Sequence, residues 1–172
     1  MKRSPELRDL SEEHHYGLVA ARSLRMASES AAPVSEAVDA FLVEWRDTIE
    51  PHFRSEETVL LPTYADVVGM GHELIVRTLA EHEALRLAVV GLAQAEWEDR
   101  RPLAAGAAQL LHDHIRFEER VLFPAIEAAL AGSGLECLGE SLHRWAGEHG
   151  RASPACRALS GLPTEEPASR MQ

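Results

Sequence analysis

Two stretches of the chain are nearly identical, and each places a histidine four residues before a glutamate. Residues 52–62 read HFRSEETVLLP and residues 114–124 read HIRFEERVLFP, with seven of eleven positions the same. Residues four apart share one face of an α-helix, so each copy stacks an imidazole over a carboxylate. Imidazole and carboxylate together suit iron or manganese. The repeat therefore predicts two halves of one metal site, supplied by His52, Glu56, His114 and Glu118.

Three histidines satisfy a test for facing the protein core, which is the presence of apolar residues about one and two turns away. His52, His82 and His114 each follow a leucine or isoleucine by three residues and precede a valine by seven. All three are therefore expected to point inward, from three separate helices.

The adjacent His14 and His15 cannot both face the core of one helix. Leucines lie four residues before and four residues after His14, whereas the apolar offsets of His15 fall between helical repeats. We expect His14 to point inward. His15 remains an alternative, because a rotation of this helix by one residue would exchange the two.

The six candidate ligands are too many for one tetrahedral metal ion and too polar to be buried without a cation. Burying a carboxylate without a compensating charge costs on the order of several kcal/mol of folding free energy. We therefore expect two iron ions bridged by the two glutamates, with manganese or zinc also possible. The predicted metal ligands are His14, His52, Glu56, His82, His114 and Glu118.

Four long helices must position these residues, because apolar residues recur at intervals of three and four between clear breakers. Pro51 lies inside the second helix and is expected to kink it just before His52, or to break it in two. Short connections between long helices favour an all-α, up-down-up-down antiparallel four-helix bundle. The expected helices cover residues 5–29, 35–68, 72–96 and 103–130.

The pattern weakens after residue 131, which divides the chain into a bundle of residues 1–131 and an extension of residues 132–172. A short helix near residues 135–145 and a frayed end from residue 161 are expected in the extension.

Composition narrows the class of protein. The 172 residues fit one domain, and 45% hydrophobic with only 5% aromatic residues favours packed helices. A net charge of −11 argues against nucleic-acid binding. No run approaches the roughly 18 apolar residues of a membrane span, and the N-terminus lacks the apolar segment of a signal peptide. We expect a cytoplasmic protein that does not bind membranes, with Cys137 and Cys156 as reduced thiols.

The order of these motifs resembles the hemerythrin-like, or HHE cation-binding, domain family. The likeness covers about residues 7–130 and extends to Glu13-His14, Glu81-His82, Leu60-Leu61-Pro62 and Phe123-Pro124. It implies a non-haem di-iron centre with carboxylate and oxo or hydroxo bridges. Such a centre binds or reacts with dioxygen or related small molecules.

The third helix departs from the oxygen-carrying members, which supply two histidines four residues apart. Thr78 and Arg86 occupy the positions four residues either side of His82. We therefore expect a protein that binds or senses oxygen, nitric oxide, peroxide or iron, rather than a reversible oxygen carrier or an enzyme. A di-iron oxidoreductase that consumes peroxide or nitric oxide is an alternative.

Two further interpretations remain open from the sequence. Ferritin-like sites use Glu-x-x-His motifs, and the chain has that spacing at residues 12–15 and 140–143. A metal-free acidic interaction module would leave the inward histidines dispensable. Glu57 and Glu119, which directly follow the proposed ligands, are expected on the solvated flanks of their helices, and Arg54 and Arg116 are expected to point away from the site.

Overall fold

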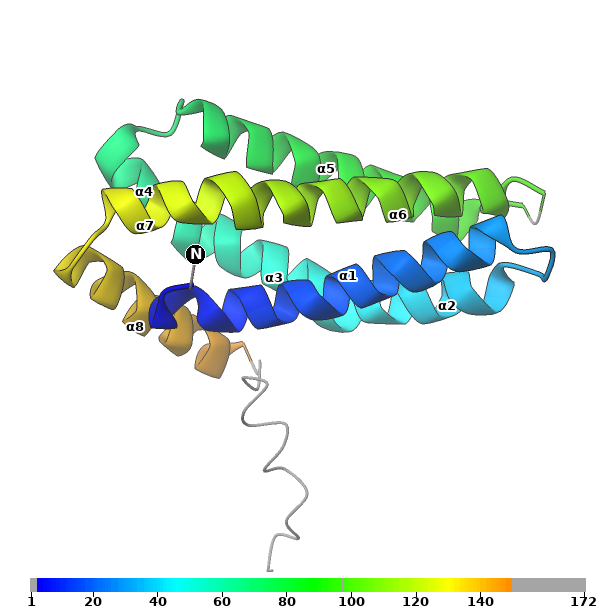
Figure 1. The fold of residues 1–172 in the computed structure, drawn as a ribbon, viewed down its shortest axis with the longest axis horizontal. Helices are drawn as coiled ribbons and strands as arrows, with labels where there is room; N and C mark the ends of the chain where they lie inside the picture. Colours follow the sequence, from blue (N-terminus) through cyan, green and yellow to red (C-terminus); the bar gives the residue numbers. More distant parts are fainter. Residues whose placement is uncertain (1–2, 97, 150–172) are drawn as a thin grey trace, which may run out of the picture.

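The computed structural model describes residues 3–96 and 98–149, and every regular element within them is helical. Four helical stretches lie side by side and form a bundle (Figure 1). The first stretch is a 3₁₀ turn, η1 (Pro5–Leu7), followed by α1 (Arg8–Glu29), and the second runs through α2 (Ser35–Glu44), α3 (Glu50–Ser55) and α4 (Leu61–Val68). The third stretch is α5 (Glu73–Gln94). The fourth joins α6 (Arg100–Phe117) to α7 (Phe123–Ala129). The predicted all-α class and the predicted helical segments are confirmed to within three residues at each end.

Three π-helical turns interrupt the second and fourth stretches without ending them: η2 (Trp45–Ile49), η3 (Glu56–Leu60) and η4 (Glu118–Leu122). Each turn begins six residues before a proline, and the residue just before that proline closes it with a hydrogen bond to the carbonyl five positions earlier. The donors and acceptors are Glu50 to Trp45, Leu61 to Glu56, and Phe123 to Glu118.

The prolines explain these turns. Proline has no backbone N–H, and in a regular α-helix its ring clashes with the carbonyl four residues earlier. A wider turn just before the proline moves that carbonyl aside, so the helix continues. Of the two outcomes expected at Pro51, the break into two helices is therefore wrong, because the widened turn η2 accommodates this proline within a continuous helix.

Two apolar clusters fill the bundle, and the candidate ligands form a polar layer between them. One cluster contains Phe53, Leu85 and Leu111, and the other contains Leu60 and Phe117. Along each ligand-bearing stretch, the apolar residues on one side of the ligands belong to the first cluster and those on the other side to the second. The six polar side chains are thus sealed from both ends of the bundle.

Helix α8 (Ser133–Glu148) lies across the end of the bundle that carries the N-terminus (Figure 1). It packs against η1, η3 and α3. Leu138 is fully buried in the same apolar cluster as Leu7, and the backbone of Gly139 approaches Glu6 so closely that an added Cβ would lie 3.0 Å from the Glu6 side chain. The helix is three residues longer at its C-terminal end than predicted, and the predicted frayed end lies outside the described residues.

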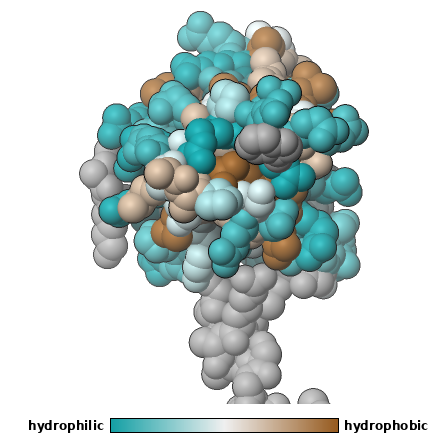
Figure 2. Space-filling view, turned by 90° about the vertical axis from the view of Figure 1, so that its right-hand side faces the viewer, coloured by the Kyte–Doolittle hydropathy of each residue, from teal (hydrophilic) through white to brown (hydrophobic). Residues whose placement is uncertain are grey.

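The opposite end of the molecule, viewed in Figure 2, is mostly hydrophilic with hydrophobic residues in small groups. No single helix among the described residues is long and apolar enough to cross a membrane. Only the segments Arg100–Ala129 and Ser133–Glu148 taken together reach the required length and composition, and they meet at a bend of 119°.

Candidate metal centre

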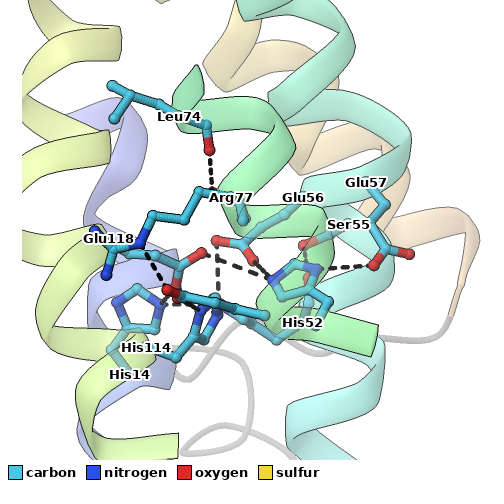
Figure 3. Close-up of polar contacts among 12 residues, drawn as sticks. His14, His52, Ser55, Glu56, Glu57, Leu74, Arg77, His114 and Glu118 are labelled. Atoms are coloured by element: carbon cyan, nitrogen blue, oxygen red, sulfur yellow. Dashed lines mark hydrogen bonds and ion pairs between the residues drawn. The ribbon is translucent and has the colours of Figure 1, made fainter. Parts of the chain in front are cut away.

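The structure brings all six predicted ligand side chains together in the polar layer. None of them is more than 3% exposed. Figure 3 shows His14, His52, Glu56, His114 and Glu118 pointing toward one another from the different helical stretches. His14 is buried whereas His15 is exposed, so α1 turns the former toward the core, as predicted.

Ligand atoms fall into two groups of four, and both groups contain the same two carboxylates. His14 and His52 join Glu56 and Glu118 in one group, and His82 and His114 join them in the other. Within each group, one nitrogen or oxygen from every residue lies within 4.8 Å of all the others. Two groups that share Glu56 and Glu118 form a symmetric set, with two imidazoles on either side of a carboxylate pair.

Distances at the centre are those of ligands facing a common space. Nε2 of His14 lies 3.0 Å from Oε2 of Glu118, and Nε2 of His114 lies 3.2 Å from the same oxygen. Nε2 of His52 and Nε2 of His82 each lie 3.3 Å from an oxygen of Glu56.

Despite these short distances, all four oxygens of Glu56 and Glu118 are buried without a hydrogen-bond partner among the described residues, as is Nε2 of His82 and of His114. Buried carboxylate oxygens are nearly always satisfied, because leaving them unpaired is costly. Cations placed between the rings and the carboxylates would satisfy these atoms, so the residues present fit a metal centre.

Each of the four imidazoles is held on its far side by a second glutamate. Because a carboxylate only accepts hydrogen bonds, Nδ1 of each ring carries a proton, and Nε2 is the nitrogen that faces the centre and is left to bind a cation. The four bonds run from His14 to Glu119 (2.7 Å), from His52 to Glu13 (2.8 Å), from His82 to Glu57 (2.8 Å), and from His114 to Glu81 (2.9 Å).

These four outer carboxylates link the helical stretches in a closed ring. The first stretch supplies Glu13 to the second, the second supplies Glu57 to the third, the third supplies Glu81 to the fourth, and the fourth supplies Glu119 to the first. Every bond therefore crosses between stretches. The ring fixes the orientation of all four imidazoles and ties the four stretches together at the level of the centre.

The predicted solvated position of Glu57 and Glu119 is wrong, because both carboxylates accept a bond from a buried imidazole. The sequence feature that could have predicted these contacts is a glutamate directly beside a ligand residue. Glu13 and Glu81 directly precede a ligand histidine, and Glu57 and Glu119 directly follow a ligand glutamate. On each helix the neighbour of an inward ligand lies at the helix flank, where it can reach the ring on the adjacent helix.

Arginines hold three of the outer carboxylates from the solvent side. Arg3 binds Glu119 at 2.7 Å, Arg77 binds Glu81 at 2.7 Å, and Arg86 binds Glu57 through both of its terminal nitrogens at 2.9 and 3.1 Å. Arg54 instead pairs with Glu50 and is well exposed, so its predicted outward orientation is confirmed.

These contacts shift the pKa values of the groups involved. Burial lowers the pKa of His82, but the nearby carboxylates of Glu118, Glu56 and Glu57 outweigh it and raise the pKa to about 11. Burial also lowers the pKa of His52, but the negative charge of Glu56 and the hydrogen bond to Glu13 outweigh it and raise the pKa to about 10. Burial raises the pKa of Glu57, but the hydrogen bonds from His82 and Arg86 prevail and lower it to about 2. Without metal, protons on the imidazoles therefore balance the buried carboxylates.

Thr78 and Arg86, which replace a second histidine on α5, are both engaged elsewhere. The buried hydroxyl of Thr78 donates to the carbonyl of Leu74 at 2.8 Å, and Arg86 binds Glu57 and Glu50. Helix α5 therefore presents one imidazole to the centre, and each group of ligands contains two histidines.

Beside His14 and His52 lies a narrow niche of about 10 Å³. Its other walls are mainly apolar and include Gly17, Ile49 and Leu111. A volume of this order holds a single water-sized molecule. The niche therefore offers space for one small, weakly polar molecule next to two ligand imidazoles.

The residues of the ferritin-like alternative do not converge. Glu12 and His15 are exposed on α1, and His143 is exposed on α8. Over the described parts of the chain, the two groups around Glu56 and Glu118 are the ones in which metal-ligating side chains cluster closely. The Glu-x-x-His interpretation is therefore not supported.

A helical bundle with a buried layer of histidines and glutamates defines a metal-binding class of protein. The model of the hemerythrin HHE cation binding domain matches residues 6–126. The chain belongs to this family, and the predicted resemblance is confirmed. Searches of curated proteins and of solved structures gave no match.

Proposed function

We propose that this protein holds two iron ions in the polar layer and uses them to bind or sense a small molecule such as dioxygen, nitric oxide or peroxide. The observation that carries the proposal is the burial of Glu56 and Glu118 among four inward imidazoles, with no hydrogen bond to their four oxygens from the part of the chain that the structure describes. A metal-free interaction module would have no use for such a costly arrangement.

The number and kind of ion are inferred from the ligand set. Two groups of four ligands that share both glutamates suit a pair of cations, with His14 and His52 on one and His82 and His114 on the other. Two imidazoles with carboxylates and open positions favour iron over structural zinc, which prefers a closed set of four ligands. Manganese or zinc could occupy the same ligands.

The chain's own residues would orient and enclose the centre. The outer glutamates hold each ring so that Nε2 faces inward, and the two apolar clusters exclude water. When bound, the ions would supply electrons and Lewis acidity to a small ligand. The niche beside His14 and His52 has room for one water-sized molecule, and its mainly apolar walls suit a small, weakly polar ligand.

A role in sensing or storage is favoured over catalysis, because no general acid or base other than the ligands and their carboxylates lines the niche. A di-iron oxidoreductase that consumes peroxide or nitric oxide is the second candidate. Two histidines per ion leave coordination positions open for a substrate, which supports this alternative.

We further infer the arrangement and limits of the domain. The turns between the four stretches alternate between the two ends of the bundle in Figure 1, which supports the up-down-up-down order. The family match ends at residue 126, which supports residues 1–131 as the hemerythrin-like bundle and residues 132–172 as an extension.

Metal titration of anaerobic, metal-free protein with Fe²⁺ tests the proposal. About two ions per chain are expected, and E56A/E118A should bind neither tightly. The control E12A/E83A removes two exposed carboxylates and the same charge, and it should bind both ions. Two ions retained by E56A/E118A, with helical circular dichroism unchanged, would show that the bridges are misassigned.

Exposure of the diferrous protein to oxygen, nitric oxide and peroxide then separates the two roles. A single stoichiometric change in the absorption spectrum supports binding or sensing, whereas repeated consumption of the reagent supports the oxidoreductase.

A further inference from the structure

A groove with a strongly positive rim lies on the outside of the bundle between α1 and α6, two helices that lie side by side in Figure 1. Its volume is about 370 Å³, within the range of small-molecule sites. The groove lies apart from the six buried ligands. Its lining residues are Leu18, Ala21, Arg22 and Arg25 from α1, with Ala108, Gln109, His112 and Arg116 from α6.

The groove follows from the spacing of small and long side chains on the two helices. Ala21 and Ala108 are buried and leave room between the helix axes. Residues about one or two turns away share their faces of the helices, and there the chain places long polar side chains: Arg25 lies four residues after Ala21, and Arg116 lies eight residues after Ala108. Small residues thus form the floor, and cationic arms form the rim.

The charge of this groove opposes that of the whole protein. The chain has 28 acidic and 17 basic residues, yet three arginines and no carboxylate are among the described residues that line the groove. Arg22 and Arg116 have no hydrogen-bond or ion-pair partner within residues 3–96 and 98–149. Arg25 reaches Glu29 only at 4.0 Å, and both side chains are more than half exposed. Such an exposed pair neutralises little.

Two other polar groups are held in place at the rim. Asp113, which lies outside the groove, accepts hydrogen bonds from Gln109 at 2.7 Å and from Nδ1 of His112 at 3.0 Å. These bonds orient the amide and the imidazole. Three guanidinium groups and two fixed polar groups therefore surround a floor that includes Leu18.

We propose that this groove binds a phosphate-bearing small molecule. Guanidinium groups bind phosphate oxygens through paired, charge-assisted hydrogen bonds, and several arginines around one site are a common means of phosphate recognition. The small apolar floor accommodates a compact organic group attached to the phosphate. Because α1 and α6 also carry His14 and His114, the occupant lies against two helices of the metal centre, but its binding does not require metal.

Isothermal titration calorimetry of the full chain with pyrophosphate, AMP and citrate tests the assignment. Pyrophosphate or AMP should bind, and R116A should weaken that binding roughly tenfold or more, the effect of losing one charge-assisted contact. R22A should act in the same way. The matched control R46A removes an exposed arginine that pairs with Asp47 outside the groove, and it should bind the probes like the unmodified protein.

The arginines of the rim are exposed, so their replacement is expected to leave the fold intact, and thermal unfolding checks this. The proposal is overturned if neither phosphate compound binds at millimolar concentration, or if R46A weakens binding as much as R116A. Binding of citrate without binding of pyrophosphate or AMP also overturns it, since the groove would then select polycarboxylates.

Discussion

Glu57 accepts a hydrogen bond of 2.8 Å from Nδ1 of His82, and Arg86 holds the same carboxylate from outside. This pair is one link of the ring of outer carboxylates, and it turns Nε2 of His82 toward Glu56. An arginine, a carboxylate and an imidazole thus form a continuous chain of contacts from the surface to the centre.

Replacing Glu57 by glutamine should weaken metal binding about 10-fold to 100-fold, because the amide no longer fixes the ring or increases its basicity as the carboxylate does. Competition between the protein and a chelator for Fe²⁺ would measure the change. E83Q, which alters an exposed glutamate, is the control and should bind as the unmodified protein does. Equal affinities in E57Q and the unmodified protein would show that the outer carboxylate does not orient the ligand.

Metal binding should stabilise the folded protein, since the ligands converge only in the folded state. At a free metal concentration about 100 times the dissociation constant, the gain is about 2.7 kcal/mol, which corresponds to several degrees in Tm. Differential scanning calorimetry with and without Fe²⁺ would measure it. The variant E56A/E118A should show no such rise in Tm. A rise of the same size in that variant would show that the metal stabilises the protein by binding outside this centre.

Gly17 lies where α1 meets α6 beside the niche, with little room for a side chain. A Cβ at this position would lie 2.8 Å from Cδ1 of Ile115, so G17A must displace that side chain. Overpacking typically costs about 1–3 kcal/mol, and the higher helix propensity of alanine offsets about 1 kcal/mol, so we expect a net loss of up to about 2 kcal/mol in the free energy of unfolding. Denaturation by urea would measure it. G106A is the matched control, because nothing lies within 4 Å of its Cβ, and it should stabilise α6 by roughly 1 kcal/mol.

Stability of the metal-free protein should fall on both sides of a mildly acidic maximum. The pKa values of Glu57 and Glu119 are lowered from 4.5 to about 2, so their contribution is complete above pH 4.5 and is lost as the pH falls toward 2. The pKa values of His52 and His82 are raised from 6.5 to about 10 and about 11, so their contribution is complete below pH 6.5 and is lost as the pH rises through these values.

Urea unfolding of metal-free protein between pH 3 and pH 10 would measure this dependence. E57Q should reduce the acid-side slope, whereas E83Q should leave it unchanged. If E57Q and the unmodified protein had the same acid-side slope, the Glu57 carboxylate would not contribute to the pH dependence.

The ligand layer could be predicted from the sequence because it depends on local periodicity. A residue with apolar residues three, four or seven positions away shares their face of the helix. This spacing places His14, His82 and His114 inward without knowledge of the neighbouring helices. The long helices could be predicted for the same reason.

The outer carboxylates could not be predicted in this way, because their partners lie on other helices. Glu57 is at the flank of its helix by periodicity, and whether a flank faces water or a neighbouring imidazole depends on how the helices cross. Arg3 illustrates the same limit. It lies outside the helical pattern of the sequence, yet it reaches Glu119 and Glu127 on the fourth stretch.

The widened turns at Glu56 and Glu118 have a consequence for any alignment of this chain. Each adds one residue to a helix that would otherwise have 3.6 residues per turn, so side chains beyond the turn are rotated by about 100° from their α-helical positions. A single-residue deletion between positions 57 and 60 would restore the regular pitch and would leave Leu61 and Tyr64 facing the core, because the wider turn holds the one extra residue. Gap placement near these prolines therefore decides whether an aligned relative retains the same interior.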